Sequence, residues 1–323
     1  MLRRTAVSVL VFSLGLVASV DALAQAWPNK PLRLVVPFTP GGSQDVIGRL
    51  FAQKVGEALG QQVIVDNKPG AGGKIATQEV ARSAPDGYTL LLSTGAQMAI
   101  EPALSSKAGY EPVKDFVHVV HLANAPLVLI ASPSLPPSTV KDFVAYTKAN
   151  AGKVNTASTG NGTYTHLTIE LFKTASGADV THVPYKGASP AFNDLLGGQV
   201  QSMFTTTASA QPYTSTGRVK AIAVTAPARS AMLPNVPTFA ESGVDLDVSV
   251  WVGIALPAKT PPQVVARLNQ EFNKALATPE VKEKLAALGT DPAGGTSEKF
   301  TAYVRGDVER WGKVIKAAGI TSD

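Results

Sequence analysis

The stretch LRLVVPFTPGGSQD, residues 32–45, places a glycine pair between an apolar run and a helix-like run. The apolar run of residues 32–38 has the pattern of a buried strand. After the glycine pair, apolar residues recur at spacings of three and four from Val46 to Leu59, which predicts an amphipathic helix with one face on a sheet. A strand that passes through glycines directly into a helix is typical of α/β proteins.

Strand-like and helix-like patterns alternate along most of the chain. Predicted strands span residues 32–38, 63–67, 89–94, 117–120, 126–131, 154–158, 180–185, 200–205 and 220–226. Predicted helices span residues 44–59, 73–83, 139–149, 164–175, 189–196, 262–277, 279–288 and 297–318. Nearly continuous apolar strands separated by helices are what a parallel sheet covered on both faces requires. The sequence therefore predicts an α/β fold.

The α/β pattern falls into two series. A proline-rich stretch at residues 132–140 separates them, and three helices remain at the C-terminal end. Two lobes are therefore predicted. Lobe 2 is expected at residues 128–227. Lobe 1 is expected to be discontinuous, built from residues 27–127 and 228–323, because the helical end of the chain is expected to pack back on the first series.

Residues 1–26 have the pattern of a secretory signal peptide. Arg3 and Arg4 precede an apolar run at residues 6–20, and two overlapping Ala-x-Ala sequences place cleavage before Trp27. A membrane anchor is the weaker alternative, because an apolar run of about 15 residues is shorter than the roughly 20 needed to span a bilayer. No later segment is long and apolar enough to span one, so the mature protein is expected to be soluble.

The composition excludes several classes of function. The chain has no cysteine, which rules out thiolate catalysis and a disulfide framework. Its formal net charge is +5, with no run of five or more Lys or Arg residues, so nucleic acid is not an expected partner. The small positive excess weakly favours anionic small molecules.

Two glycine loops lie between a strand and a helix. The loop Gly41-Gly42-Ser43 can hold an anion on backbone N–H groups at the helix start, or it can simply form a tight turn with Ser43 as the N-cap. This segment alone does not separate the two interpretations. A second segment, residues 154–172, repeats the plan with Thr159-Gly160-Asn161-Gly162-Thr163. One such loop in each predicted lobe suggests a ligand held across a cleft by both.

Neither glycine-rich segment fits a nucleotide-binding motif. Residues 160–165 have Thr where the dinucleotide motif has its third Gly, and residues 68–75 lack the first Gly and the Ser or Thr of a phosphate loop. Gly70, Gly72 and Gly73 are expected to form a turn into a helix, with ligand contact as the less favoured alternative. No cofactor is predicted.

The histidines do not form a catalytic or metal-binding cluster in the sequence. His118 and His121 are three residues apart on a predicted strand, which sends them to opposite faces, while His166 and His182 stand alone. No Gly-x-Ser-x-Gly sequence occurs. Only His166 is kept as a candidate ligand contact, and support of the glycine loop is its alternative.

Two further strand ends offer polar groups. Ser93-Thr94-Gly95-Ala96 ends the third predicted strand, and ligands of open α/β sheets lie beyond the carboxyl ends of strands. Tyr185 ends a strand of the second series and either covers the ligand or closes the edge of the sheet. Trp251, in an apolar run, is expected in the core or at a hinge.

With these residues in view, the chain resembles the Bug family, the periplasmic solute receptors of tripartite tricarboxylate transporters. The resemblance runs nearly end to end from residue 27. It is carried by WPNKPLRLVVPFTPGGSQDVIGRL, DNKPGAGGKIATQEVARSAPDGYTLLL, STGNGTYTHLTIELF, VTHVPYKGASPAFNDLLGGQVQSMF, RVKAIAVTAPARSAMLPNVPTFAESG, and the segment from PPQVVARLN to WGKVIKAAG. Together these motifs are highly specific, although each loop alone is not.

The resemblance implies a type II periplasmic-binding-protein fold whose two lobes close on a small organic carboxylate. In the family, the loop after the first strand and the glycine loop of the second lobe pinch a ligand carboxylate, largely through backbone amides and ordered water. A strand-end loop and the segment around Tyr185 also face the cleft. The candidate ligand-binding residues are therefore Thr39, Pro40, Gly41, Gly42, Ser43, Ser93, Thr94, Gly95, Ala96, Gln97, Ser158, Thr159, Gly160, Asn161, Gly162, Thr163, His166, Tyr185 and Thr205.

The resemblance has further implications. Asp45 matches an acidic position expected to support the first loop. The protein is expected in the periplasm, as a receptor and not an enzyme, with two integral membrane subunits as partners. Many relatives read Met-Phe-Asp where this chain reads Met203-Phe204-Thr205, so the expected ligand is a mono- or dicarboxylate, aliphatic or aromatic, without a cationic amine. A ligand-loaded sensor for a membrane signalling protein, and less favourably an enzyme of a small organic acid, remain alternatives.

Overall fold

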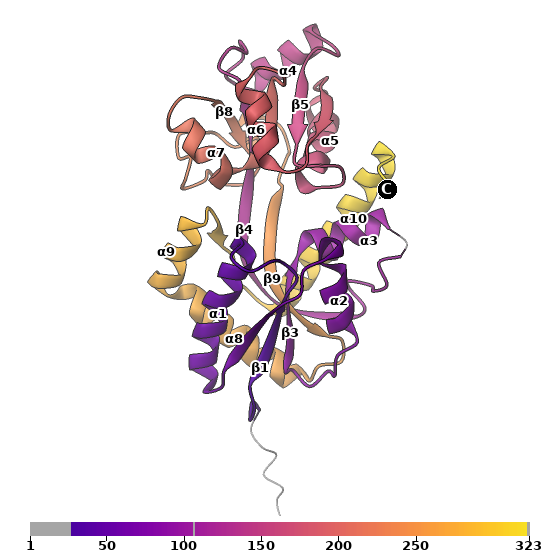
Figure 1. Ribbon diagram of the computed structural model, residues 1–323, viewed down its shortest axis with the longest axis vertical. Coiled ribbons are helices and arrows are strands. Elements are labelled where there is room, and N and C mark those ends of the chain that lie inside the picture. The colour runs from indigo at the N-terminus through magenta and orange to yellow at the C-terminus, as the bar shows by residue number, and fades with distance from the viewer. Residues whose placement is uncertain (1–26, 106, 322–323) are drawn as a thin grey trace, which may run out of the picture.

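The computed structural model describes residues 27–105 and 107–321. It consists of two α/β bodies, one above the other in Figure 1, with the long strands β4 (Phe116–Ala131) and β9 (Ser249–Pro257) running up the junction between them. We call the lower body lobe 1 and the upper body lobe 2. The predicted signal peptide lies outside the described residues, and the predicted residue boundaries of the lobes stay a prediction.

Lobe 1 is built on the sheet segment β2-β1-β3-β9-β4. Its strands are β1 (Leu32–Val36), β2 (Val63–Asn67), β3 (Thr89–Thr94), β9 and the short β10 (Asp291–Pro292), which pairs with β4. Its helices are α1 (Ser43–Leu59), η1 (Ala71–Gly73), α2 (Lys74–Ala81), η2 (Ala96–Ile100), α3 (Glu101–Leu104), α8 (Pro262–Ala277), α9 (Pro279–Ala287) and α10 (Ser297–Ala318).

Lobe 2 is built on the segment β4-β7-β5-β6, with β8 also paired to β4. Its strands are β5 (Asn155–Ser158), β6 (Thr181–Pro184), β7 (Ser202–Thr206) and β8 (Lys220–Val224). Its helices are α4 (Val140–Ala149), α5 (Tyr164–Ser176), α6 (Ala188–Leu196), α7 (Thr207–Thr214) and η3 (Ala240–Ser242).

The sheets are mixed, which corrects the expectation of parallel sheets. β1 pairs in parallel with β2 and β3, and β5 does so with β6 and β7. However, β9 runs antiparallel to both β3 and β4, and β4 runs antiparallel to β7 and β8. The reversal arises because β4 and β9 carry the chain between the lobes in opposite directions. The sequence analysis did not assign β9 as a strand, although its apolar run fits a strand buried on both faces.

β4 is a single strand of 16 residues, whereas the sequence predicted two strands at 117–120 and 126–131. The gap in the prediction arose from Asn124 and Pro126, which are typical of turns. In the structure, Pro126 is the last β4 residue paired with β9, and Leu127 is the first paired with β7. The strand thus changes sheets where its pattern is interrupted, and Pro126 disturbs no central ladder.

A bulge in β4 corrects the expectation for two histidines. The pairing with β9 shifts register after His118, so that His118 opposes Ala255 and His121 opposes Gly253. Because these partners are two positions apart on β9, both histidines lie on the same face of the sheet. Both rings contact Phe300 of α10, with centroid distances of 5.5 Å and 5.2 Å. The prediction of opposite faces was wrong because the bulge adds one residue between them.

The helix α10 contacts the cores of both lobes. Near its start, Phe300 and Val304 pack in one buried cluster with Trp251 of β9. Farther along, Trp311 and Ile315 pack in the cluster that contains the aromatic core of lobe 2. Figure 1 shows α10 running from the lower body toward the junction. Full burial of such side chains contributes about 1.5–3 kcal/mol each to the free energy of unfolding. The helix α10 is therefore held against both lobes by buried side chains.

Candidate ligand cleft between the lobes

A cavity of about 790 Å³ lies between the two lobes. Its lining contains no Lys or Arg, and its single acidic residue, Glu101, pairs with Lys74 at 3.4 Å. Neutral hydroxyl, amide and apolar groups therefore dominate it. The lining residues are Phe38, Gln44, Gly72, Ala96, Ile100, Glu101, Leu104, Leu127, Thr159, Asn161, Gly162, Thr163, Tyr164, Thr165, Ala188, Thr205, Thr206, Ser209, Val250 and Thr321.

The predicted site residues divide into two groups in the structure. Those that line the cavity are Ala96, Thr159, Asn161, Gly162, Thr163 and Thr205. Those that do not line it are Thr39, Pro40, Gly41, Gly42, Ser43, Ser93, Thr94, Gly95, Gln97, Ser158, Gly160, His166 and Tyr185. The ligand contacts themselves stay a prediction.

The first glycine loop ends at an uncapped helix start. Gly42 is the N-cap of α1 and no side chain caps it, so Ser43 is the first helical residue and not the N-cap. The first intrahelical bond is donated by Val46 to Gly42. Within the described residues, the amides of Ser43 and Gln44 have no acceptor. Such N–H groups at the positive end of a helix dipole are suited to an anion, and Gln44 lines the cavity.

Asp45 holds the first loop from within. Its carboxylate is buried and accepts hydrogen bonds from Gly41 N at 2.9 Å, Arg49 Nε at 3.0 Å and Asn67 Nδ2 at 2.8 Å. Burial alone would raise its pKa, but the hydrogen bonds from Arg49, Gly41 and Asn67 outweigh burial and lower the pKa of Asp45. Gly41 has φ +84°, a conformation that glycine adopts readily, and this aims its amide at the carboxylate.

The second glycine loop uses most of its own amides internally. The donated bonds are Thr159 N to Thr165 Oγ1, Gly160 N to Ser158 Oγ, Gly162 N to His166 Nδ1, and Thr163 N to the Gly160 carbonyl. Among residues 159–163 only Asn161 keeps an amide without a protein acceptor. Asn161 lines the cavity and is exposed. The loop is therefore a rigid turn that leaves one amide free.

The helix that follows the second loop also begins with free amides. Thr163 caps α5 by accepting from His166 N, and the first intrahelical bond is Leu167 N to Thr163 O. Tyr164 and Thr165 both line the cavity, and within the described residues their amides have no acceptor. A helix N-terminus from each lobe thus reaches the same cavity.

The loop after β3 is mostly interior. Gln97 is buried; its side-chain Oε1 accepts from Thr94 N at 2.9 Å, and its carbonyl accepts from Tyr110 at 2.6 Å. Gly95 leaves no room for a side chain, because an added Cβ would lie 1.6 Å from the Tyr164 hydroxyl. Only Ala96 of this loop reaches the cavity, so the loop supports the wall more than it lines it.

His166 and Tyr185 are both engaged away from the cavity. The ring of His166 stacks on that of His182, with centroids 3.8 Å apart, so these two histidines do not stand alone as the sequence suggested. Tyr185 donates from its hydroxyl to Asp194 Oδ2 at 2.7 Å. Burial, together with this bond, raises the pKa of Tyr185 to about 12. The tyrosine thereby fastens the end of β6 to α6.

Several residues that line the cavity were not predicted from the sequence. Thr206 caps α7 by accepting from Ser209 N, and both line the cavity, so a second helix start of lobe 2 reaches it. The hydroxyl-rich run after β7 was a usable signal for this. It was overlooked because α7 contains Pro212 and has little amphipathic pattern. Gly72, for which ligand contact was the less favoured alternative, also lines the cavity. The other lining residues that were not predicted are Phe38, Gln44, Ile100, Glu101, Leu104, Leu127, Tyr164, Thr165, Ala188, Val250 and Thr321.

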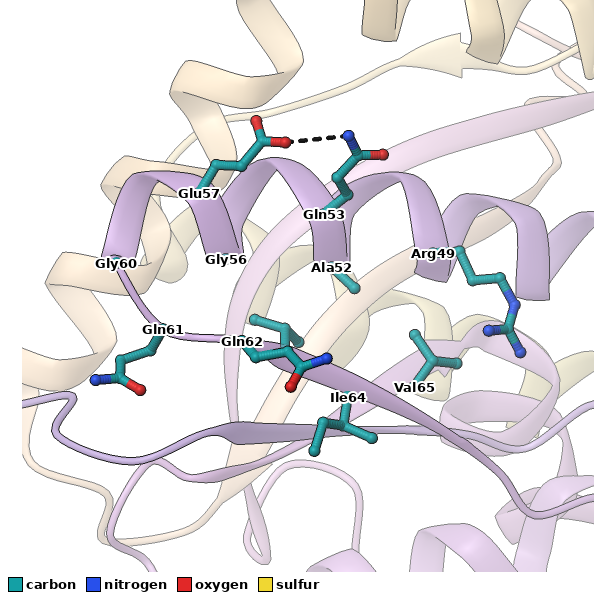
Figure 2. Close-up of a pocket in the computed structure, with 11 residues that line it drawn as sticks. Arg49, Ala52, Gln53, Gly56, Glu57, Gly60, Gln61, Gln62, Ile64 and Val65 are labelled. Carbon is teal, nitrogen blue, oxygen red and sulfur yellow. Dashed lines mark hydrogen bonds between the residues drawn. The ribbon is translucent and has the colours of Figure 1, made fainter.

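A second hollow lies on lobe 1 alone, between α1 and β2 (Figure 2). It has a volume of about 770 Å³, and one wall carries Gln53, which donates to Glu57 at 3.0 Å. Ile64 lies on the opposite wall and is about half exposed. None of the predicted site residues lines this hollow. It meets only one lobe, so it does not fit a ligand held by two.

Residues 27–105 and 107–321 contain neither a metal-binding group nor a membrane-spanning helix. No group of three or more His, Cys, Asp or Glu residues there is placed to hold a metal ion. None of the helices in the same ranges is long and apolar enough to cross a membrane.

A family model described as the tripartite tricarboxylate transporter family receptor matches residues 47–320. The chain belongs to this receptor family. BugT of Bordetella pertussis is 36% identical over 315 residues, which cover 97% of this receptor and 96% of BugT. The expectation drawn from the sequence motifs is thus confirmed.

Solved structures confirm the two-lobed α/β fold of this receptor. R. palustris Rpa4515, solved with adipate, is 34% identical, with a TM-score of 0.74 over 91% of this chain and 99% of that one. MatC (Rpa3494) from Rhodopseudomonas palustris, solved with bound malate, is 32% identical, with a TM-score of 0.70 over 89% and 99% of the two chains. Both of those ligands are dicarboxylates.

Proposed function

We propose that this receptor captures a small carboxylate between its two lobes. The observation that carries the proposal is the convergence of α1 and α5, one from each lobe, on a single cavity with unused amides at both helix starts. A carboxylate has enough lone pairs to accept from both ends at once. Its charge is stabilised by two helix dipoles without any Lys or Arg in the lining.

The same arrangement provides a mechanism for closure. With the lobes apart, each helix start can satisfy its amides only with water. A carboxylate held by both ends gains hydrogen bonds that exist only when the lobes meet, so it shifts the population toward the closed state. Relatives with bound adipate and malate support a carboxylate as the ligand class.

Thr205 favours a ligand without an amine. It is buried at the end of β7 and lines the cavity from lobe 2. A threonine hydroxyl has no charge to neutralise an ammonium group, and burying such a charge without a partner is costly. The only acidic group of the lining, Glu101, is already paired with Lys74. We therefore propose a mono- or dicarboxylate, aliphatic or aromatic, over an amino acid.

The remaining parts of the proposal concern location and partners. The predicted signal peptide and the receptor family support a periplasmic location and delivery of the ligand to two integral membrane subunits. Binding without turnover is proposed, because the one histidine kept as a possible general base, His166, is engaged with the glycine loop and does not line the cavity.

Calorimetric titration of the purified protein tests the proposal. Adipate and malate are expected to bind and aspartate and glutamate to bind at least tenfold more weakly, with bound acid recovered unchanged. A ligand at about 100 times its Kd should stabilise the protein by about 2.7 kcal/mol in thermal unfolding. Tight binding of aspartate would overturn the amine-free ligand, and binding of no carboxylate in a wider panel would overturn the function.

A further inference from the structure

The two stacked histidines lie directly behind the second glycine loop. His166 belongs to the first turn of α5 and His182 to β6, and their rings are nearly parallel, with an interplanar angle of 11° and centroids 3.8 Å apart. His166 is buried and His182 is partly buried. Neither ring lines the cavity, whereas Asn161 and Gly162 of the loop do.

Each ring engages one loop amide. His166 Nδ1 accepts directly from Gly162 N at 3.1 Å, which places the His166 proton on Nε2. His182 Nε2 hydrogen-bonds Ser158 Oγ at 2.6 Å, and that hydroxyl accepts from Gly160 N at 3.2 Å. The stacked pair thus turns the amides at positions 160 and 162 toward the protein. Asn161, between them, is left with the free amide.

We propose that His166 and His182 are positioning residues, which set the second glycine loop so that the amide of Asn161 faces the bound carboxylate. This inference rests on the proposed function. The proposal explains why His166 follows the loop. Its ring nitrogen accepts from the Gly162 amide, which without an acceptor would compete for the ligand or for water.

The surroundings keep both rings neutral. Burial lowers the pKa of His182 to about 4, with smaller contributions from His166 and Lys173. Burial also lowers the pKa of His166, where nearby Glu170 acts in the opposite direction and Lys173 in the same one. A protonated His166 carries a hydrogen on Nδ1 and cannot accept from Gly162. Acid is therefore expected to release the loop.

Paired substitutions separate positioning from mere packing. His166→Asn places an amide oxygen near the position of Nδ1, and His182→Gln places an amide group near Nε2, whereas His166→Leu and His182→Leu keep bulk without polarity. Calorimetry with adipate and malate at pH 7.5 is expected to show at least a tenfold loss of affinity in each leucine variant. The amide variants are expected to stay within about threefold of the unmodified protein, a threefold change being about 0.6 kcal/mol.

A pH profile provides a second readout. As the pH falls from 6.5 toward 4, the affinity of the unmodified protein is expected to fall more steeply than that of the double variant His166→Asn with His182→Gln. The double variant shares the titration of the ligand but has no titrating ring. Superimposable profiles would overturn the proposal. So would leucine variants that bind as well as the amide variants.

The free protein distinguishes failure of this inference from failure of the proposed function. Hydrogen exchange of the Gly162 amide, measured without ligand, is expected to be slow in the unmodified protein and in His166→Asn, and at least tenfold faster in His166→Leu. If neither acid binds the unmodified protein while exchange follows this order, the proposed function fails and the positioning of the loop stands. Equal exchange in all three proteins would overturn the positioning role itself.

Discussion

The indole Nε1 of Trp251 donates a 2.8 Å hydrogen bond to Asp307 Oδ2, and this bond joins β9 to α10 at the junction of the lobes. Both residues are almost fully buried. Asp307 is also paired with the guanidinium of Arg310, which in turn donates to the Asp247 carbonyl. β9 is one of the two strands that run up the junction, and α10 packs on both lobes, so this carboxylate connects two elements that closure must move together.

Replacement of Asp307 by Ala is expected to lower the free energy of unfolding by about 3–5 kcal/mol, because it leaves a buried indole N–H without its acceptor and the Arg310 guanidinium without its charge partner. Asp307→Asn retains an acceptor for the indole and should lose less. Urea unfolding followed by tryptophan fluorescence measures both. Equal midpoints for the alanine variant and the unmodified protein would contradict this account.

Asp45 should make the free energy of unfolding depend on pH in the acidic range. Its pKa is lower in the folded protein than the ordinary value of 3.8, so the folded form binds the proton more weakly than the unfolded chain does. Its contribution is complete above about pH 5 and is lost as the pH falls through 3.8 toward the folded pKa. Asp45→Asn should cost about 1–3 kcal/mol at pH 7, because a donor replaces an acceptor facing Gly41 and Arg49. This difference should shrink below pH 3.8, whereas parallel curves would be inconsistent with it.

Thr205 should control selectivity by charge. Thr205→Asp brings a carboxylate into the cavity near the bound acid, and like charges in a partly buried site repel. Affinity for adipate or malate is expected to fall at least tenfold, about 1.4 kcal/mol. Thr205→Asn, which is similar in size and neutral, is the matched control and should stay within about threefold. Calorimetry on the two variants decides the matter, and equal losses would mean that shape and not charge is responsible.

Gly95 should be intolerant of any side chain. An added Cβ would lie 1.6 Å from the Tyr164 hydroxyl and 2.6 Å from Trp251 Nε1. Gly95→Ala is expected to destabilise the protein by about 1–3 kcal/mol through overpacking. Combining it with Tyr164→Phe removes the nearest atom and should recover part of the loss. Thermal unfolding of the two single variants and the double variant measures this coupling, and strict additivity would contradict the proposed contact.

Local patterns were sufficient for most helices and for the strand that opens the chain. The sequence predicted α8 and α10 at the residues where the structure has them, because amphipathic spacing is a local signal. The sequence did not predict β4 as one strand or β9 as a strand, because both depend on pairing with strands that are distant in the chain. Asn124 and Pro126 resemble a turn locally, but they occupy the place where one strand passes between two sheets.

The candidate site shows the same division. The glycine loops and the threonines at 205–207 could be recognised in the sequence. The direction in which each loop amide points could not, because it depends on which side chain accepts its hydrogen bond in the folded chain. Asp45 accepts from the amide of Gly41, and His166 accepts from that of Gly162. His182 hydrogen-bonds the Ser158 hydroxyl that accepts from the amide of Gly160. A pattern of glycines cannot show which of its N–H groups remain free.

The family, the α/β class with two lobes, and the two strand-to-helix glycine loops were predictable from the sequence, since they follow from composition, periodicity and motifs within short windows. Three features depend on the folded chain: the starts of α1 and α5 reach one cavity, His118 and His121 share a face, and α10 packs on both lobes. The physical reason is that contacts and hydrogen-bond acceptors are set by positions in space, which a bulge of one residue or a strand that changes sheets can alter without changing the local pattern.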